Sequence, residues 1–392
     1  MITPKKPVLM RITTIPASMQ VLLRGQISFM RENGFDVVMV SSEGKEVEAL
    51  KMQEGAPHFV IPFTRVISPV KDLVCLFKLM RLMRKIKPDI VHTHTPKAGL
   101  IGMWAAFLTG VPVRLHTIAG LPWMETTGLM RSLLKAVEKL TFLPATMVFP
   151  NSYRQKDFLF SNGIGKNKME VLGNGSSNGI DTDHFFANEE VRSEAQRLRT
   201  NENVKEGWVW IFIGRLVKDK GLEELLDAFS AISQRYPDDR LWLLGNEEPE
   251  LDPLTQRSAE VLHAHPKIKK WGFINDVRPY LSASDVLVFP SYREGFPNVP
   301  MQAGSMGCAL ILSDINGCNE IIEHGKTGLL IEPKNGPALS AAMMRLRETP
   351  GLKESLTEKT RESIIQGFSQ KKLWEILRLK YLYFLEKKKK RV

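Results

Sequence analysis

The chain has 392 residues, 43% of them hydrophobic and 25% charged, which is typical of a folded globular protein and excludes a disordered one. Because one hydrophobic core rarely organises so many residues, we expect two domains. The formal net charge of +11 favours an anionic partner such as nucleic acid, acidic lipid or a phosphorylated small molecule, although a basic surface that only confers solubility is an equal alternative.

Short apolar runs alternate with longer amphipathic stretches in the first half of the chain. The first run, within "MITPKKPVLMRITTIP", is too short and too interrupted for a signal peptide. Alternation of this kind, with nearly continuous apolar strands, predicts a parallel sheet covered on both faces by helices. The predicted strands span residues 7–13, 36–42, 89–95, 112–118 and 146–152, and the helices between them include 19–33 and 73–87.

Two basic amphipathic segments lie in this half, "LVCLFKLMRLMRKIK" at 73–87 and "GLMRSLLKAVEKLTFLP" at 128–144. A helix of this kind can lie on an anionic membrane surface. The alternative for each helix alone is packing on the sheet with its cations in solvent. Because there are two, we expect a membrane surface as a partner, with the basic tail at 387–391 as a further lipid contact.

Histidines lie on two of the predicted strands. "VHTHTPKAG" places His92 and His94 on one face of a strand, and "VPVRLHTIAGLP" places His116 on the next. The pair suggests a metal, but the sequence offers no third ligand, so we expect no metal site. A single histidine is more often structural than catalytic, and both roles remain open from the sequence.

The alternation restarts after the turn-rich segment 171–185 and the polar segment 187–206. We therefore predict an α/β protein of two Rossmann-like doubly wound domains, joined near 185–205 and facing each other across a cleft. Such domains bind ligands outside the carboxyl ends of their strands. The predicted strands of this half span residues 208–214, 240–245, 268–273, 285–290, 309–314 and 328–333.

The segment "GRLVKDKGLEELL" follows the first strand of the second half. Gly214 allows a tight turn, and Arg215 and Lys220 flank the start of a predicted helix. A helix N-terminus with free N–H groups and two cations is a good receptor for a diphosphate. The alternative is an ordinary strand–helix loop with basic surface residues.

The segment "SYREGFPNVPMQAGSMG" follows the predicted strand 285–290. It places Glu294 at the strand end and Gln302 eight positions later, a little over two helical turns if a helix begins near residues 298–300. A carboxylate binds a pair of hydroxyls well because it accepts several hydrogen bonds. The alternative is a capping glutamate and a solvent-facing glutamine.

Cysteine usage and sequence motifs limit the cell compartment and the kinds of partner that we expect. The three cysteines (Cys75, Cys308 and Cys318) are odd in number and unclustered, which favours a reducing compartment. No apolar run reaches the roughly 18 residues of a membrane span. Without zinc-type spacings or an arginine-rich aromatic tail, we expect no nucleic-acid partner. The expected location is cytoplasmic, peripheral at the inner face of the membrane.

Four segments together resemble the family 4 retaining glycosyltransferases of the GT-B fold, in family order and over nearly the whole chain: "NGIDTDHF", "GRLVKDKG", "GFINDVRPYLSASDVLVFPSYREGFPN" and "NGCNEIIEHGKTGLLIEP". "VPMQAG" resembles a capsule and O-antigen subgroup. The resemblance implies transfer of a hexose or N-acetylhexosamine from a nucleotide-sugar, expected to be UDP-linked, to a lipid-linked or saccharide acceptor. It also implies retention at the anomeric carbon, no metal and no cofactor.

The resemblance assigns roles to particular residues. Arg215 and Lys220 would bind the donor diphosphate, and Glu294 would contact the transferred sugar, with His116 as a second catalytic residue. Gln302 stands where the family has a second glutamate that holds the ribose, and an amide can still bond hydroxyls. Further donor contacts are expected from Gly214, Phe273, Gly295, Phe296, Pro297 and Asn298, and acceptor contacts from Ser18, His94 and Lys97.

The resemblance also divides the chain. Residues 1–190 would bind the acceptor and residues 200–368 the donor, while the last helix, within 369–392, would cross back to the N-terminal domain. A sugar-nucleotide 2-epimerase of the same fold is one alternative, against which Glu294, Gln302 and "GRLVKDKG" argue. A non-catalytic sugar- or lipid-binding relative is another, which Gln302 keeps open. Hydrolysis of donor without acceptor distinguishes an enzyme from a binding protein.

Overall fold

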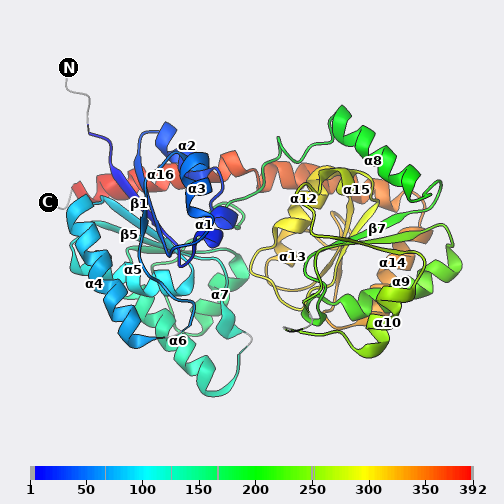
Figure 1. Ribbon diagram of the computed structural model, residues 1–392, viewed down its shortest axis with the longest axis horizontal. Coiled ribbons are helices and arrows are strands. Elements are labelled where there is room, and N and C mark those ends of the chain that lie inside the picture. The colour runs from blue at the N-terminus through cyan, green and yellow to red at the C-terminus, as the bar shows by residue number, and fades with distance from the viewer. Residues whose placement is uncertain are drawn as a thin grey trace. The chain divides into compact units, whose positions relative to one another are not determined.

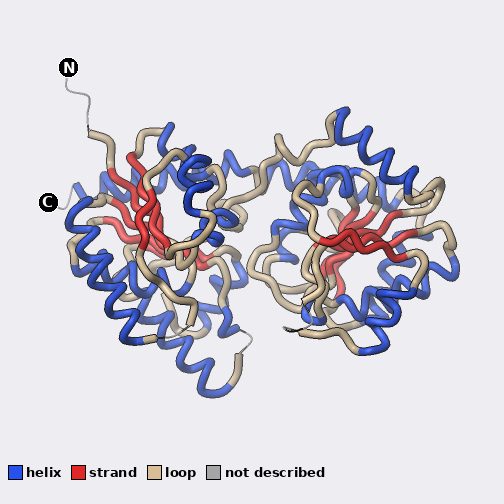
Figure 2. Tube along the Cα trace, viewed as in Figure 1, coloured by secondary structure: helices blue, strands red, loops and turns tan. Residues whose placement is uncertain are grey.

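The computed structural model describes residues 5–66, 68–124, 126–165, 167–248, 250 and 252–389. The chain forms two compact units. Unit 1 comprises Met1–Gly179 with Gln370–Val392, and unit 2 comprises Ile180–Ser369. Each unit has a central sheet with helices packed on its two faces (Figures 1 and 2). The predicted pair of doubly wound α/β units is therefore confirmed.

Unit 1 contains a six-stranded parallel sheet in the order β3-β2-β1-β4-β5-β6. Its strands are β1 (Val8–Ile12), β2 (Asp36–Ser41), β3 (His58–Val60), β4 (Ile90–His94), β5 (Val113–Ile118) and β6 (Met147–Pro150). Its helices are α1 (Pro16–Leu22), α2 (Gln26–Glu32), α3 (Val47–Glu54), α4 (Pro69–Ile86), α5 (Pro96–Leu108), the short η1 (Pro122–Met124), α6 (Gly128–Phe142), α7 (Tyr153–Ser161) and α16 (Gln370–Lys389).

Alternate residues of each strand in unit 1 enter different cores, because successive side chains of a strand point to opposite faces. Met10 of β1 packs with residues of α4 and α5, whereas Leu9 packs with residues of α2 and α16. The apolar side of α16, including Leu377 and Phe384, is thus part of the core of unit 1. Burial on both faces explains why the strands are nearly uninterrupted apolar runs.

Unit 2 contains a second six-stranded parallel sheet, in the order β12-β11-β10-β7-β8-β9. Its strands are β7 (Val209–Ile213), β8 (Arg240–Leu244), β9 (Ile268–Gly272), β10 (Val286–Phe289), β11 (Ala309–Ser313) and β12 (Leu329–Ile331). Its helices are α8 (Glu189–Asn201), the short η2 (Lys218–Lys220), α9 (Leu222–Arg235), α10 (Gln256–Ala264), α11 (Arg278–Ser282), α12 (Asn298–Met306), α13 (Cys318–Ile321), α14 (Gly336–Glu348) and α15 (Leu352–Gly367).

The strand order of unit 2 reverses between β7 and β10. From β7 the chain first adds β8 and β9 on one side, and it then returns to add β10 on the other side. The loops that leave β7 and β10 therefore diverge from adjacent carboxyl ends, which is where open α/β sheets bind ligands. The residues that follow Ile213 and Phe289 therefore lie where this architecture favours a ligand site.

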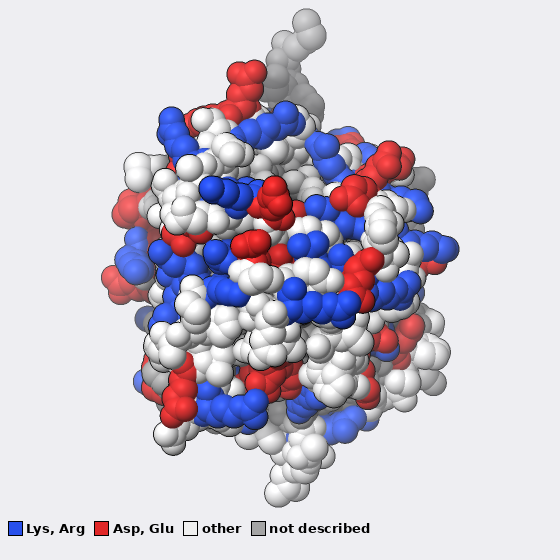
Figure 3. Space-filling view, turned by 90° about the vertical axis from the view of Figure 1, so that its right-hand side faces the viewer, with Lys and Arg blue, Asp and Glu red and all other residues white. Residues whose placement is uncertain are grey.

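Charged side chains of both signs are interspersed on the face that Figure 3 shows, without a large area of one sign. The net positive charge of the chain is therefore not concentrated on that face. Among the helices that the structure describes, none is both long enough and apolar enough to cross a membrane.

Candidate functional site

The loops after β7 and β10 bring two predicted site residues into contact. Lys220, at the end of η2, places its Nζ 2.6 Å from Oε1 of Glu294, which follows β10. Each side chain is only 16% exposed. Seventy-four positions separate the two residues in sequence, and parallel pairing of β7 with β10 is what makes them neighbours. The carboxylate thus holds the ammonium group at the carboxyl edge of the sheet.

Arg215 is also paired with a carboxylate. Its Nη1 lies 3.2 Å from Oε2 of Glu248, in the loop between β8 and α10, and the two side chains are 44% and 30% exposed. The sequence interpretation did not include Glu248, although it belongs to the acidic run "NEEPELD" after Gly245. Both cations expected to bind a diphosphate are therefore neutralised by carboxylates that a stronger anion could displace.

Two glycines let these loops pack against each other. Gly221 has a φ of +69°, and a Cβ atom there would lie 2.1 Å from the carbonyl oxygen of Pro290. Gly245 has a φ of +138°, and a Cβ atom there would lie 1.9 Å from the carbonyl oxygen of Gly214. Since no side chain fits at either distance, glycine is required for the loops after β7, β8 and β10 to approach this closely.

Two helices begin at this edge without side-chain caps. The N-cap residues of α9 and α12 are Gly221 and Pro297, and neither contributes a capping hydrogen bond. The N–H groups in the first turn of each helix have no partner within their own helix. Together with the helix dipole, such groups favour an anion at the edge where Lys220 and Arg215 lie.

The other residues that the sequence predicted to contact the donor are less tightly arranged. Gln302 lies on α12 and is half-buried, and its side chain makes no hydrogen bond to another residue within the described ranges. Phe273 follows β9 and is 72% exposed, free to stack on a ligand. Gly295, Phe296 and Pro297 form the turn between Glu294 and α12. The structure thus brings Glu294 together with Lys220, and it shows no direct contact of Gln302 with either residue.

A buried polar network occupies the other unit. Arg11 of β1 is fully buried and donates to the hydroxyl of Tyr381 on α16 over 3.0 Å, to Oε1 of Gln26, and to Nε2 of His94 over 2.9 Å. An arginine only donates, so His94 accepts at Nε2 and carries its proton at Nδ1. The Tyr381 hydroxyl oxygen also lies 2.6 Å from Nδ1 of His92, within hydrogen-bond distance.

This network keeps the histidine pair neutral. Burial lowers the pKa of both His92 and His94 well below the ordinary value, and the nearby Arg11 guanidinium lowers each further. Nδ1 of His94 has no partner among the described residues. Within the described ranges, no group of three His, Cys, Asp or Glu side chains is arranged as metal ligands. The pair therefore acts in unit 1 as part of the contact between β4 and α16.

His116 faces the opposite side of the sheet. Its Nδ1 lies 2.8 Å from Oγ1 of Thr93, and a Cβ atom at Gly99 of α5 would lie 2.5 Å from its ring. Burial lowers the pKa of His116 to about 4, so the ring is neutral near pH 7. The residue is buried, and this packing between β5 and α5 favours the structural alternative that the sequence left open.

Ser18 and Lys97, which the sequence predicted to contact the acceptor, lie near the start of helices. Ser18 lies in the first turn of α1 and is half-buried. Lys97, in α5, places its Nζ 2.8 Å from Oδ1 of Asp72 and also donates to Thr64 and to the carbonyl oxygen of Val66. These contacts hold α5 against the start of α4, so the ammonium of Lys97 is engaged within unit 1.

Three neighbouring helices of unit 1, α4, α5 and α6, present apolar side chains to solvent. Helices α4 and α6 both pack against α5 (Figure 1). Phe77 of α4 is 61% exposed and Leu129 of α6 is 90% exposed. The other exposed apolar residues of this face are Val70, Leu73, Val74, Phe107, Leu108, Met130, Leu133, Leu140 and Leu143. Exposed cations follow on the second half of α4, at Lys78, Arg81, Arg84 and Lys85.

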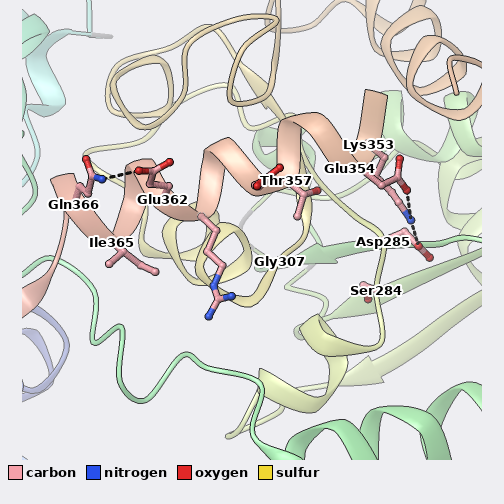
Figure 4. A pocket seen from close by; sticks show the side chains of 11 residues that line it. Ser284, Asp285, Gly307, Lys353, Glu354, Thr357, Glu362, Ile365 and Gln366 are labelled. Carbon is pink, nitrogen blue, oxygen red and sulfur yellow. Dashed lines mark hydrogen bonds and ion pairs between the residues drawn. The ribbon is translucent and has the colours of Figure 1, made fainter. Parts of the chain in front are cut away.

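A pocket of about 700 Å³ lies elsewhere in unit 2, along α15 (Figure 4). Ser284 and Asp285, which line it, precede β10, whereas Glu294 follows this strand. The pocket thus opens at the amino edge of the sheet. Lys353 fills part of this region by an ion pair of 2.8 Å with Asp285. The candidate site and this pocket lie at opposite edges.

Comparisons with known proteins match both halves of the chain. A family profile described as "Glycosyl transferase 4-like domain" matches residues 19–175, and one described as "Glycosyl transferases group 1" matches residues 208–349. The capsular polysaccharide biosynthesis glycosyltransferase CapM of Staphylococcus aureus is 34% identical over 366 residues, which cover 93% of this chain and 94% of CapM.

A second relative and a solved structure extend the comparison. The UDP-Gal:alpha-D-GlcNAc-diphosphoundecaprenol alpha-1,3-galactosyltransferase of Escherichia coli is 27% identical over 342 residues, which cover 86% of each chain. The crystal structure of Anabaena Alr3699/HepE in complex with UDP has a TM-score of 0.80 at 18% identity, covering 97% of this chain and 100% of the other. That similarity concerns the fold.

Proposed function

This chain belongs to the family 4 glycosyltransferases of the GT-B fold, and from that premise we propose that it moves a sugar from a UDP-sugar to a lipid-linked acceptor in the synthesis of a surface polysaccharide. The observation that carries the proposal is the contact of Lys220 with Glu294 at the carboxyl edge of unit 2. The names of relatives support the substrates, because one uses UDP-Gal and a diphosphoundecaprenol-linked sugar and a structural neighbour binds UDP.

Unit 2 is the proposed donor-binding unit. A donor diphosphate would displace Glu248 from Arg215 and Glu294 from Lys220, since phosphate oxygens accept stronger bonds from these cations. The freed Glu294 carboxylate would then accept from hydroxyls of the transferred sugar. Phe273 is placed to stack on a flat ring of the donor, and Gln302 is the proposed partner of the ribose.

The chemical step in this proposal depends on electrostatic stabilisation. Negative charge develops on the diphosphate as the bond to the anomeric carbon breaks, and Arg215, Lys220 and the first turns of α9 and α12 would stabilise it. These groups supply positive charge without a metal. We propose retention at the anomeric carbon, as the family implies, with Glu294 engaged by sugar hydroxyls and not as a covalent nucleophile.

Binding and turnover measurements test the donor site. Arg215→Ala and Lys220→Ala should each reduce the affinity for UDP by roughly 10- to 150-fold, because a hydrogen bond to a charged group contributes about 1.5–3 kcal/mol. The affinity for uridine should change much less. Arg257→Ala, which removes an exposed cation of α10, is the matched control. Glu294→Gln should nearly abolish transfer in a protein with unchanged circular dichroism. Equal losses for UDP and uridine would contradict the proposal, and UDP binding without donor hydrolysis would favour a binding protein.

Unit 1 is the proposed acceptor-binding unit, and its α4–α6 face is the proposed contact with an anionic membrane. Exposed Phe77 and Leu129 would enter the interfacial region while the cations of α4 meet lipid phosphates. Residues 387–389 of the expected basic tail belong to α16, and 390 and 391 lie outside the described residues. This contact would hold the protein peripherally at the inner face of the membrane.

Vesicle sedimentation tests the membrane contact. The protein should bind phosphatidylglycerol-containing vesicles more strongly than pure phosphatidylcholine vesicles, and salt should weaken the difference. Phe77→Ser with Leu129→Ser should reduce binding, because both side chains lose apolar area that the interface would cover. Met52→Ser is the control, because Met52 of α3 is 80% exposed, between Phe77 and Leu129, and lies outside the α4–α6 face. Equal binding by all three proteins would contradict this part of the proposal.

A further inference from the structure

The loop after β11 contacts residues 290–297 after β10, which we call the donor loop, from the side opposite Lys220. Strand β11 pairs in parallel with β10, so the segment 314–317 that leaves β11 lies beside the segment 290–297 that leaves β10. Asn316 of this segment is half-buried and directs its amide at the donor loop. Its Nδ2 donates to the carbonyl oxygen of Gly295 over 2.7 Å and to that of Glu294 over 3.2 Å.

These two bonds set the direction of two backbone N–H groups. The peptide bond is planar and trans, so the C=O and N–H of one peptide group point in opposite directions. The carbonyl of Glu294 shares a peptide group with the N–H of Gly295, and the carbonyl of Gly295 shares one with the N–H of Phe296. By holding both carbonyls, Asn316 turns both N–H groups away from itself.

Neither N–H group has an acceptor within the part of the chain that the structure describes. The same is true of the N–H groups of Asn298 and Val299, which begin α12 without a side-chain cap. Along the five residues that follow Glu294, four donors thus have no acceptor among the residues that the structure describes. Because the flanking residue is glycine, rotation of these peptide groups costs little unless something holds them.

Gly317 allows the contact to form. Its φ is +81°, and a Cβ atom there would lie 2.5 Å from the carbonyl oxygen of Gly295 and 2.9 Å from the Cα of Phe296. Only a residue without a side chain lets the loop after β11 come close enough for Asn316 to reach both carbonyls. Asn316 and Gly317 therefore act together on the same two peptide groups.

We propose that Asn316 is a positioning residue for the donor, which fixes the N–H groups of Gly295 and Phe296 in the orientation that binds the diphosphate or the transferred sugar. The inference rests on the proposed function, in that the loop after β10 must face the donor. It adds a residue that touches no substrate atom and acts by preventing the rotation of two peptide groups.

Substitution of Asn316 by Asp tests the inference, because the side chain keeps its shape but loses both donors. The Asn316→Asp enzyme should lose roughly 10- to 150-fold in affinity for UDP-glucose, used as the probe, the factor expected when one bond to a charged group is lost. Its affinity for uridine and its melting temperature should change little. Asn316→Ala removes the same donors without adding a charge and should give the same pattern.

Asn319→Ala is the matched control, since it removes a 2.6 Å bond to Asp314 in the same segment without touching the donor loop. It should bind UDP-glucose normally. Equal losses of uridine and UDP-glucose affinity, or normal affinity for both in the two Asn316 variants, would overturn the inference. Arg215→Ala and Lys220→Ala distinguish a failure of this inference from a failure of the proposed donor site: if they weaken UDP-glucose binding and Asn316→Asp does not, only the positioning role is wrong. If they leave UDP unaffected, the donor site itself is wrong.

Discussion

Substitution of Gly221 by Ala should damage unit 2 more than the same substitution at Gly351. Both glycines have left-handed backbone, with φ values of +69° and +75°, and both begin a helix of unit 2. An alanine at Gly351 would meet no atom within 4 Å, whereas at Gly221 its Cβ would lie 2.1 Å from the carbonyl oxygen of Pro290. The pair therefore separates the cost of the backbone conformation from the cost of the close approach.

The magnitudes follow from that geometry. A non-glycine residue in the left-handed region costs roughly 1–2 kcal/mol, which both variants share. At Gly221 the chain must also move by about 1 Å to restore a normal contact, and such overpacking costs roughly 1–3 kcal/mol more. For a unit of this size, each kcal/mol lowers the melting temperature by about 2–4 °C. Scanning calorimetry should therefore show a fall in melting temperature of roughly 2–8 °C for Gly351→Ala and a clearly larger fall for Gly221→Ala.

The shift of the chain at Gly221 should also displace Lys220 in the candidate functional site. Lys220 precedes Gly221 directly and lies 2.6 Å from Glu294, so a shift of about 1 Å breaks that contact and misplaces the ammonium. A misplacement of this size can reduce turnover by about 100-fold. At a temperature where both variants are folded, Gly221→Ala should lose UDP affinity and Gly351→Ala should keep it. If calorimetry and UDP titration cannot tell the two variants apart, the close approach at Pro290 has no importance for the site.

Three further predictions concern single side chains. Gln302→Leu should weaken the binding of a ribose-containing donor by about 1–3 kcal/mol, as measured by calorimetry, but not the binding of its 2′-deoxy analogue. If the variant and the wild type discriminate equally between these two donors, Gln302 is a surface residue of α12. Burial raises the pKa of Glu138 to about 7, so the unfolded state releases this proton from about pH 4.5 while the folded state retains it. The resulting destabilisation grows as pH rises and reaches about 3 kcal/mol near pH 7. Glu138→Gln should thus raise the melting temperature at pH 7.5 and not at pH 4.5, unlike the exposed control Glu32→Gln, and a pH-independent effect would contradict this account. His116→Asn should retain turnover if His116 is structural, whereas a 100-fold loss with an unchanged melting temperature would restore its catalytic role.

Much of the fold was predictable because parallel strands are buried on both faces. Runs such as 209–213 and 286–289 contain only apolar residues, which distinguishes them from the amphipathic helices around them. The loops that carry Arg215 and Glu294 were predictable for a related reason. Open α/β sheets bind ligands beyond the carboxyl ends of their strands, and Arg215 lies two positions after the end of β7 and Glu294 five positions after the end of β10.

The contacts between loops were not predictable from local patterns. Lys220 meets Glu294, and Asn316 meets Gly295, only because the strand order places β7, β10 and β11 side by side. The side of the sheet on which His116 lies could not be predicted either. In a strand buried on both faces, the sequence does not distinguish the side that packs on α5 from the side that packs on α16.

The last helix has a consequence for how the protein is made. Tyr381 of α16 is fully buried in unit 1 against residues of β1 and β4, yet the 190 residues of unit 2 separate α16 from the rest of unit 1. At about 5–20 residues per second, a ribosome needs roughly 10–40 s to synthesise that interval. During this time the nascent first unit exposes the apolar side of its sheet that α16 later covers. We expect unit 2 to complete its folding before unit 1 does, and chains that stop before residue 370 to be substrates for chaperones and proteases.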